Sequence, residues 1–191
     1  HIQIAMRDAM LNYCRTPMSR QEQFGETILP RTGSRILGSS PGGLYPCKPG
    51  GPDDYCYIFT ARGNEEHWRR LVTAIDRLDL LEDNRLQDSA SRYEHQDIVD
   101  GAITAWTSER SKTEVMEVIA GAGVPCGPVY STYELLRDED LHNRGMMQRI
   151  DHPERGEMTV AGWPLRMSDT KVPIEPSPLH GGDSGDVLKE W

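Results

Sequence analysis

Small residues that could support acyl chemistry gather in one segment, residues 38–43. The segment consists of Gly38, Ser39, Ser40, Pro41, Gly42 and Gly43. It contains the pattern G-x-S-x-G, in which a serine nucleophile stands on a sharp turn between a strand and a helix. Proline and glycine directly after Ser40 disfavour that helix, so we do not expect a hydrolase serine.

The same small residues favour a different chemical role for residues 38–43. Without bulky side chains, backbone N–H groups can approach an acyl or carboxylate oxygen, as the donors of an oxyanion hole do. We therefore predict that this segment binds substrate as a mobile lid. The alternative is a flexible linker between domains, because a loop is functional only where a site lies beneath it.

The other reactive side chains form no constellation in the sequence. The cysteines Cys14, Cys47, Cys56 and Cys126 lack C-x-x-C spacing and paired histidines, so we expect free thiols and no zinc site. Cys126 is the one candidate nucleophile, and between Pro125 and Gly127 it is more typical of a small buried residue. Acidic clusters near residues 76–83 and 138–140 are typical of solvated helix ends. We predict no catalytic residue and no metal site within these residues.

The composition excludes several classes of partner. The net charge of −9 and the isoelectric point near 5.1 argue against wide contact with nucleic acid. A charged fraction of 27% and a mean hydropathy of −0.61 indicate a globular, water-soluble chain without a membrane span. We therefore expect a cytoplasmic protein with neither nucleic acid nor membrane as partner.

Periodicity and turn residues predict the elements that would position the segment. Strands are expected at residues 45–48 and 55–60, joined by a turn, and near 129, 148–150, 158–161 and 165–167. Helices are expected after Asn64, over residues 98–106, and over 111–122, where Ser111 and Glu114 fit a capping box. The middle of the chain is thus an α+β domain.

Both ends of the chain carry apolar stripes. Ile2 and Ile4 alternate with polar residues like the end of a strand, and a helix stopped before Pro17 follows. The stripes consist of Met6, Ala9, Met10 and Tyr13, and of Val187, Leu188 and Trp191. Each is expected to need a packing partner outside the chain, the alternative being that the two stripes pack on one another.

Residues 121–129, with the sequence GAGVPCGPV, carry the densest backbone constraints and predict a helix end that turns into a strand. This run closely resembles the G-(I/V)-P-C-G-P-V segment of class III CoA-transferases, the family of formyl-CoA:oxalate CoA-transferase and the CaiB/BaiF proteins. Residues 1–11, 41–48, 159–164 and 178–189 resemble further segments of that family in the same order. The family is roughly twice as long, so the resemblance implies a C-terminal half.

For the fold, the resemblance implies a small α+β domain plus terminal elements that complete a Rossmann-like α/β large domain. The implied boundaries are residues 1–17 in the large CoA-binding domain, 18–43 as interdomain linker and glycine/serine loop, 44–175 as the small domain, and 176–191 as the return to the large domain. The family forms interlocked homodimers, and the long segment 18–43 would suit such threading.

For function, the resemblance implies transfer of CoA between an acyl-CoA thioester and a carboxylic acid through a covalent aspartyl intermediate. The nucleophilic aspartate would lie in the missing N-terminal half, CoA thioester would be a substrate, no permanent cofactor is implied, and this chain alone would be inactive. The family's glycine-rich loop corresponds to residues 36–40, where Ile36 and Leu37 depart from it, which argues against oxalate as substrate. An acyl-CoA racemase of the same fold and a non-catalytic binding or assembly module are the alternatives.

Overall fold

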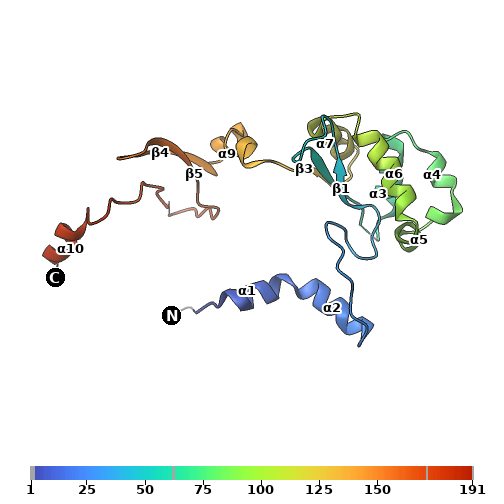
Figure 1. Ribbon diagram of the computed structural model, residues 1–191, viewed down its shortest axis with the longest axis horizontal. Helices are drawn as coiled ribbons and strands as arrows, with labels where there is room; N and C mark the ends of the chain where they lie inside the picture. Colours follow the sequence, from blue (N-terminus) through green and yellow to red (C-terminus); the bar gives the residue numbers. More distant parts are fainter. Residues whose placement is uncertain (1–2, 62, 171, 191) are drawn as a thin grey trace.

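The computed structural model describes residues 3–61, 63–170 and 172–190. In chain order the elements are α1 (Met6–Tyr13), α2 (Arg15–Phe24), β1 (Gly42–Pro46), β2 (Tyr55–Phe59), α3 (Glu65–Ala74), α4 (Asp79–Glu82), the 3-10 helix η1 (Asn84–Leu86), α5 (Ser89–Glu94), α6 (Gln96–Thr107), α7 (Lys112–Gly121), β3 (Cys126–Pro128), α8 (Thr132–Leu135), α9 (Glu139–Asn143), β4 (Met147–His152), β5 (Gly156–Ala161) and α10 (Ser184–Glu190). Figure 1 shows β1, β3 and helices α3 to α7 as one packed body, from which α1–α2 and the part from α9 to α10 extend as two arms.

The packed body is built on an antiparallel sheet with the strand order β1-β2-β3. In its register Tyr45 faces Cys56, and Ile58 faces Cys126. These residues point to the covered face, while Leu44 on the other face is 41% exposed. The predicted hairpin of β1 and β2 is confirmed, but β1 begins three residues earlier than expected, at Gly42.

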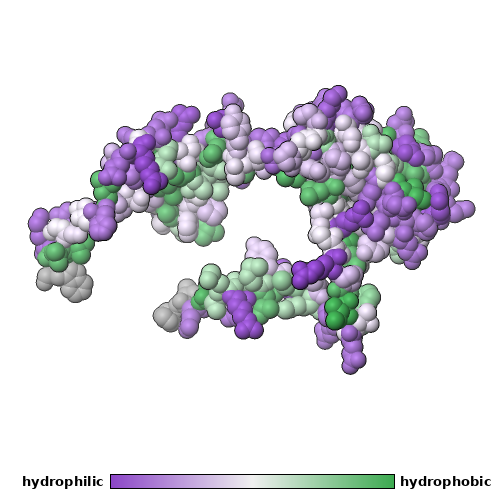
Figure 2. All heavy atoms as spheres, in the orientation of Figure 1, coloured by the Kyte–Doolittle hydropathy of each residue, from purple (hydrophilic) through white to green (hydrophobic). Residues whose placement is uncertain are grey.

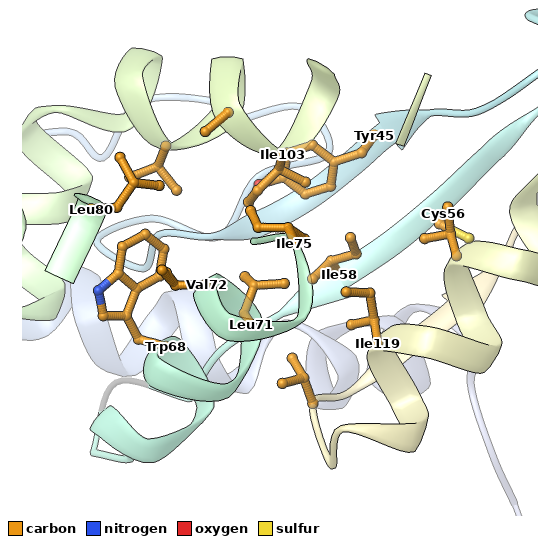
Figure 3. Close-up of a cluster of buried hydrophobic side chains, with 14 of the residues drawn as sticks. Tyr45, Cys56, Ile58, Trp68, Leu71, Val72, Ile75, Leu80, Ile103 and Ile119 are labelled. Atoms are coloured by element: carbon orange, nitrogen blue, oxygen red, sulfur yellow. The ribbon is translucent and has the colours of Figure 1, made fainter. Parts of the chain in front are cut away.

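The core lies between this sheet and the surrounding helices. Figure 3 shows Trp68, Leu71 and Val72 of α3 directed into the same cluster as Ile103 of α6 and Ile119 of α7. α6 packs on β1, and α7 packs on β2 and β3. The helical spacing of apolar residues in the sequence therefore identified the buried faces of α3 and α6 and most of that of α7. In α7 the same spacing also included Val118, which is exposed.

The ends of the predicted helices have the expected caps. The Asn64 side chain accepts a hydrogen bond from the Glu66 N–H at the start of α3. Ser111 and Glu114 form the capping box of α7. At the other end of α7, Gly123 has a φ of +78°, and the N–H of Val124 donates to the carbonyl of Ile119. This arrangement is a Schellman motif, so the predicted glycine exit is confirmed.

Other expectations about the elements were wrong. Residues 18–24 are helical rather than an unstructured connection, because Pro17 occupies the first turn of α2, where proline is tolerated. Residues 165–167 form no strand, and neither does Ile4. Ile2 lies outside the described residues. The strands expected at residues 148–150 and 158–161 are confirmed, because β4 and β5 form a two-stranded sheet in which Met147 faces Ala161.

The architecture is thus a mixture of helices and two small antiparallel sheets, as the predicted α+β domain requires. Completion of a Rossmann-like large domain and the proposed domain boundaries stay predictions. The apolar stripe of α1 does lie on one helix, but Met6, Met10 and Tyr13 are all exposed. Val187 and Leu188 of α10 are exposed as well, and Trp191 lies outside the described residues. Figure 2 shows apolar side chains gathered over α1.

Candidate functional site

Residues 38–43 lie at the edge of the packed body, where the connection from α2 enters β1. Ser39, Ser40, Pro41, Gly42 and Gly43 are buried, and Gly38 is half-buried. Gly42 and Gly43 already belong to β1, so the residue after Ser40–Pro41 continues into a strand. A nucleophile elbow continues into a helix, and the structure thus supports the expectation that Ser40 is not a hydrolase serine.

Hydrogen bonds hold the segment on both sides. The Ser39 hydroxyl donates to the Thr60 carbonyl at 3.1 Å, and the Thr60 N–H donates to the Pro41 carbonyl at 3.1 Å. The Ile36 N–H donates to the Gly42 carbonyl at 3.2 Å. Burial and hydrogen bonding of this kind are typical of an anchored segment rather than of the mobile loop that we expected. Substrate binding by residues 38–43 stays a prediction.

A polar network flanks the segment at Gly43. The Tyr45 hydroxyl donates to Asp100 Oδ1 at 2.8 Å, and Arg35 Nη2 lies 2.7 Å from Asp100 Oδ2. Burial and, next, the Asp100 charge raise the pKa of Tyr45, so this phenol stays protonated and acts as a donor. A cavity of about 80 Å³ between Ser34, Gly43 and Asp100 has space for water but not for an acyl-CoA.

Beneath the segment lies Arg92 of α5, whose side chain is 1% exposed. Its guanidinium donates to the Ser40 carbonyl, to the Leu86 carbonyl and to the Glu65 carboxylate. Neither Arg92 nor Asp100 was identified from the sequence. They lie about fifty residues beyond the segment, and nothing in the sequence around them distinguishes a buried arginine or aspartate from a solvated one.

Three of the four cysteines lie on the covered face of the sheet, and all four are free thiols. Cys47 and Cys56 are buried and Cys126 is half-buried. Burial raises the pKa of Cys47 to about 12, and the hydrogen bond with Cys126, followed by burial, raises that of Cys56. The same bond lowers the pKa of Cys126, but among the described residues no histidine or carboxylate accompanies it as a base. The arrangement is that of core thiols.

Among residues 3–61, 63–170 and 172–190, no group of three or more His, Cys, Asp or Glu side chains is placed to hold a metal ion. In the same described ranges, none of the helices has the length and apolarity needed to cross a bilayer. An open hollow of about 900 Å³ lies on the second arm, between the β4–β5 hairpin and residues 163–170 and 172–174. It does not include residues 38–43, so the structure keeps the two regions separate.

A family model decides what the chain is related to: residues 1–184 match the model described as CoA-transferase family III. The chain belongs to this family. The resemblance found in the sequence is thereby confirmed. Formyl-CoA:oxalate CoA-transferases of Streptomyces coelicolor and Streptomyces avermitilis are 34% and 32% identical to this family III chain over 199 residues. Each match covers 97% of the chain and 48% of the relative, so the chain spans about half the length of the curated relatives it matches.

Solved structures share the fold of this family III chain. A CaiB/BaiF family protein from Brucella suis matches with a TM-score of 0.75 and 20% identity, over 100% of this chain and 47% of that one. A Mycobacterium tuberculosis protein matches with a TM-score of 0.69 and 17% identity, over 96% of this chain and 46% of that one. At these identities the likeness concerns the fold alone.

Proposed function

We propose that this chain is the C-terminal portion of a CoA-transferase that moves CoA between an acyl-CoA thioester and a carboxylic acid. The observation that carries the proposal is the 34% identity with a formyl-CoA:oxalate CoA-transferase over 97% of the chain. The half-length match supports a longer protein whose nucleophilic aspartate precedes residue 1. In this proposal no residue of this chain makes or breaks a bond.

In the proposed reaction, the aspartate attacks the thioester carbonyl to form a mixed anhydride and release CoA thiolate. The thiolate then attacks the aspartyl carbonyl, which gives an aspartyl-CoA thioester and frees the first carboxylate. The acceptor carboxylate opens this thioester to a new anhydride, and the thiolate attacks its acyl carbon to give the new acyl-CoA. The covalent steps divide one difficult exchange into easier ones.

Residues 38–43 would contribute by binding and shielding these intermediates. Because the segment is largely buried and hydrogen-bonded, we infer that it serves as a fixed wall of the site rather than as a moving lid. Its small side chains would let an acyl or carboxylate oxygen approach backbone N–H groups at the edge of the packed body. The acceptor need not be oxalate, because Ile36 and Leu37 stand where the resemblance places glycines. The assembled protein would be an interlocked cytoplasmic homodimer.

The test uses the full-length protein that contains this chain. Purified protein is incubated with formyl-CoA or a longer acyl-CoA and with oxalate or a longer carboxylic acid, and exchanged thioesters are detected by mass spectrometry. Transfer that is lost when the upstream aspartate is replaced by alanine supports the proposal. Epimerised acyl-CoA without exchange would indicate a racemase, and the absence of both activities a binding module.

Two companion measurements test the remaining parts of the proposal. The 191-residue chain alone should not transfer CoA, and transfer by it would place the nucleophile within these residues. Light scattering of the full-length protein should give the mass of a dimer. A monomer at micromolar concentration would contradict the proposed homodimer.

A further inference from the structure

Arg92 is a charged residue in the interior of the packed body. Its side chain is 1% exposed, although arginine is almost never fully buried unless it is paired. The only carboxylate that pairs with it among the described residues is Glu65, whose side chain is 49% exposed. A half-exposed partner is screened by water, so the ion pair alone gives little reason for burying the guanidinium.

The guanidinium uses its donors on three different parts of the chain. Nε donates to the Ser40 carbonyl at 3.3 Å, Nη1 to the Leu86 carbonyl at 3.0 Å, and Nη2 to Glu65 Oε1 at 3.0 Å. The guanidinium carbon, Cζ, lies 5.0 Å from the centre of the Trp68 ring. A planar fork of donors can satisfy three acceptors at fixed angles, whereas the single ammonium of a lysine cannot reach all of them.

Of these acceptors, the Ser40 carbonyl belongs to the segment 38–43. Leu86 lies in the 3-10 helix η1, and Glu65 lies in α3. Core residues, Leu86 itself in η1 and Trp68 in α3, fix the positions of these two helices. Ser40 precedes β1 and has no ladder of its own. The bond to the Ser40 carbonyl is the longest of the three at 3.3 Å, but its charged donor makes it stronger than a neutral bond of the same length. It therefore contributes to holding the least regular of the three parts.

We propose that Arg92 is a positioning residue that holds residues 38–43 in place through the Ser40 carbonyl. α5 and the core hold the Arg92 guanidinium in a fixed position, and its hydrogen bond to the Ser40 carbonyl holds the segment. The consequence for CoA transfer rests on the proposed function, because it requires that the segment contacts substrate. The anchoring itself does not depend on that function.

The anchoring is measured by amide hydrogen exchange on the full-length protein and its Arg92→Lys variant. The N–H groups of Ile36 and Thr60 report on it directly, because they donate to the carbonyls of Gly42 and Pro41. In the variant these two amides should exchange about tenfold faster or more, as expected for the loss of a hydrogen bond to a charged group. Amides of α7, which lies away from Arg92, should be unchanged.

Two matched variants separate the anchor from the ion pair. Arg69→Lys changes an exposed arginine of α3 and should leave the Ile36 and Thr60 amides unaffected. Glu65→Gln removes the carboxylate charge but keeps an oxygen acceptor and leaves the bond to Ser40 intact, so its effect should be smaller than that of Arg92→Lys. If Glu65→Gln accelerates exchange as much as Arg92→Lys, the ion pair rather than the Ser40 bond holds the segment, and the proposal is wrong.

The effect of Arg92 on catalysis is measured by steady-state kinetics of CoA transfer. In Arg92→Lys, kcat should fall by about tenfold to a hundredfold with little change in KM, because a misplaced segment weakens transition-state contacts. If kcat is unchanged while the Ile36 and Thr60 amides exchange faster, Arg92 anchors the segment but has no role in catalysis. If wild-type protein transfers no CoA, the proposed function fails, and the exchange data still decide the anchoring.

If the Arg92→Lys variant does not fold, a measurement on the wild-type protein still tests the anchoring. In the wild-type protein, nitrogen NMR resolves the Arg92 Nε–H group, which donates to Ser40. Protection of this proton from exchange comparable to that of the Thr60 amide supports the anchor. Exchange as fast as that of the exposed Arg69 side chain would overturn it.

Discussion

Gly38 is the residue of the 38–43 segment whose backbone requires glycine. Its φ of +66° lies in the left-handed region, whereas Gly42 is not in that region and a Cβ added there would meet its nearest neighbours at 3.5 to 3.7 Å. The sequence pointed to both glycines for their lack of a side chain, and only Gly38 also adopts a positive φ. Which of several glycines adopts a positive φ depends on the path of the whole segment and cannot be deduced from residue types.

This difference in backbone conformation predicts that alanine destabilises the protein at Gly38 but not at Gly42. Gly38→Ala should lower the free energy of unfolding by about 1–2 kcal/mol, the cost of a left-handed conformation for a residue with a Cβ. Gly42→Ala should be close to neutral, because its φ suits any residue and its methyl group fits at ordinary contact distance. Denaturant unfolding of both variants measures the two values, and equal losses would contradict the assignment.

Lys112 and Glu134 form a partly buried polar contact away from the segment. Lys112 Nζ donates to the carbonyls of Asp53 and Val129 and lies 2.6 Å from Glu134 Oε1. The hydrogen bond from Lys112 and, next, those from Ser131 hold the pKa of Glu134 at about 2, below its usual range. The network links the turn before β2, the end of β3 and the start of α8.

The lowered pKa of Glu134 predicts a pH dependence of stability. Because the folded-state pKa is below the unfolded value of about 4.3, the carboxylate contributes stability above that pH and loses it as pH falls through the folded pKa. Glu134→Gln should therefore lower stability at neutral pH, and its difference from wild type should shrink as pH falls from about 5 toward 2. Denaturant unfolding at several pH values measures this difference.

Glu139→Gln serves as the control, because Glu139 is an exposed residue of α9 outside the Lys112 network. Its difference from wild type should show no comparable decline in acid. A Glu134→Gln effect that is constant from neutral to acid pH would mean that the side chain contributes through its shape rather than its charge.

Among the helices, those with a long apolar repeat, α3, α6 and α7, were predicted from the sequence, whereas the short helices α4, α8 and α9 were not. α3, α6 and α7 have ten to twelve residues, apolar positions at helical spacing and, for α3 and α7, cap residues. α4, α8 and α9 have only four or five residues, too few for a periodic pattern to appear. Such turns are stabilised by contacts with the rest of the fold, which a local pattern does not contain.

Neighbouring residues of α7 lie on its buried and its exposed face. Ile119 is 0% exposed and packs in the core, whereas Val118 next to it is 42% exposed. Ile119→Ala should cost about 2–5 kcal/mol of unfolding free energy, because it removes buried methyl groups and leaves a cavity. Val118→Ala should change stability by less than about 0.5 kcal/mol, as surface substitutions usually do.

Thermal or denaturant unfolding of the two α7 variants provides the comparison. They differ by one position on one helix, so helix propensity and overall charge are nearly matched. Comparable losses would mean that α7 presents a different face to β2 and β3 than the structure describes.

The segment 38–43 was identified from residue types and the resemblance, but the residues that surround it were not. The residues that contact it include Arg92 and Thr60, which the fold brings to Ser40 and Pro41 from distant parts of the sequence. Such long-range pairs depend on the packing of β1, β2 and α5 together. The sequence therefore predicted a candidate site without predicting what holds it.

The exposed stripe of α1 is the clearest feature of the molecular surface outside the packed body. Met6, Met10 and Tyr13 are 87%, 63% and 86% exposed and lie on one side of the helix. A contiguous apolar face of this kind is unfavourable in water and is typical of a contact surface. Figure 2 shows the apolar residues of this arm next to one another.

We therefore expect the 191-residue chain to associate with a second copy of itself through α1. Light scattering should give a mass above the 21.5 kDa of one chain at micromolar concentration. The double variant Met6→Gln, Met10→Gln should lower that mass, because glutamine keeps the length and helix propensity of methionine while removing the apolar surface. Asn12→Gln, on another side of the same helix, should leave the mass unchanged. A monomeric wild-type chain, or association that the double variant does not weaken, would show that the α1 face does not drive self-association.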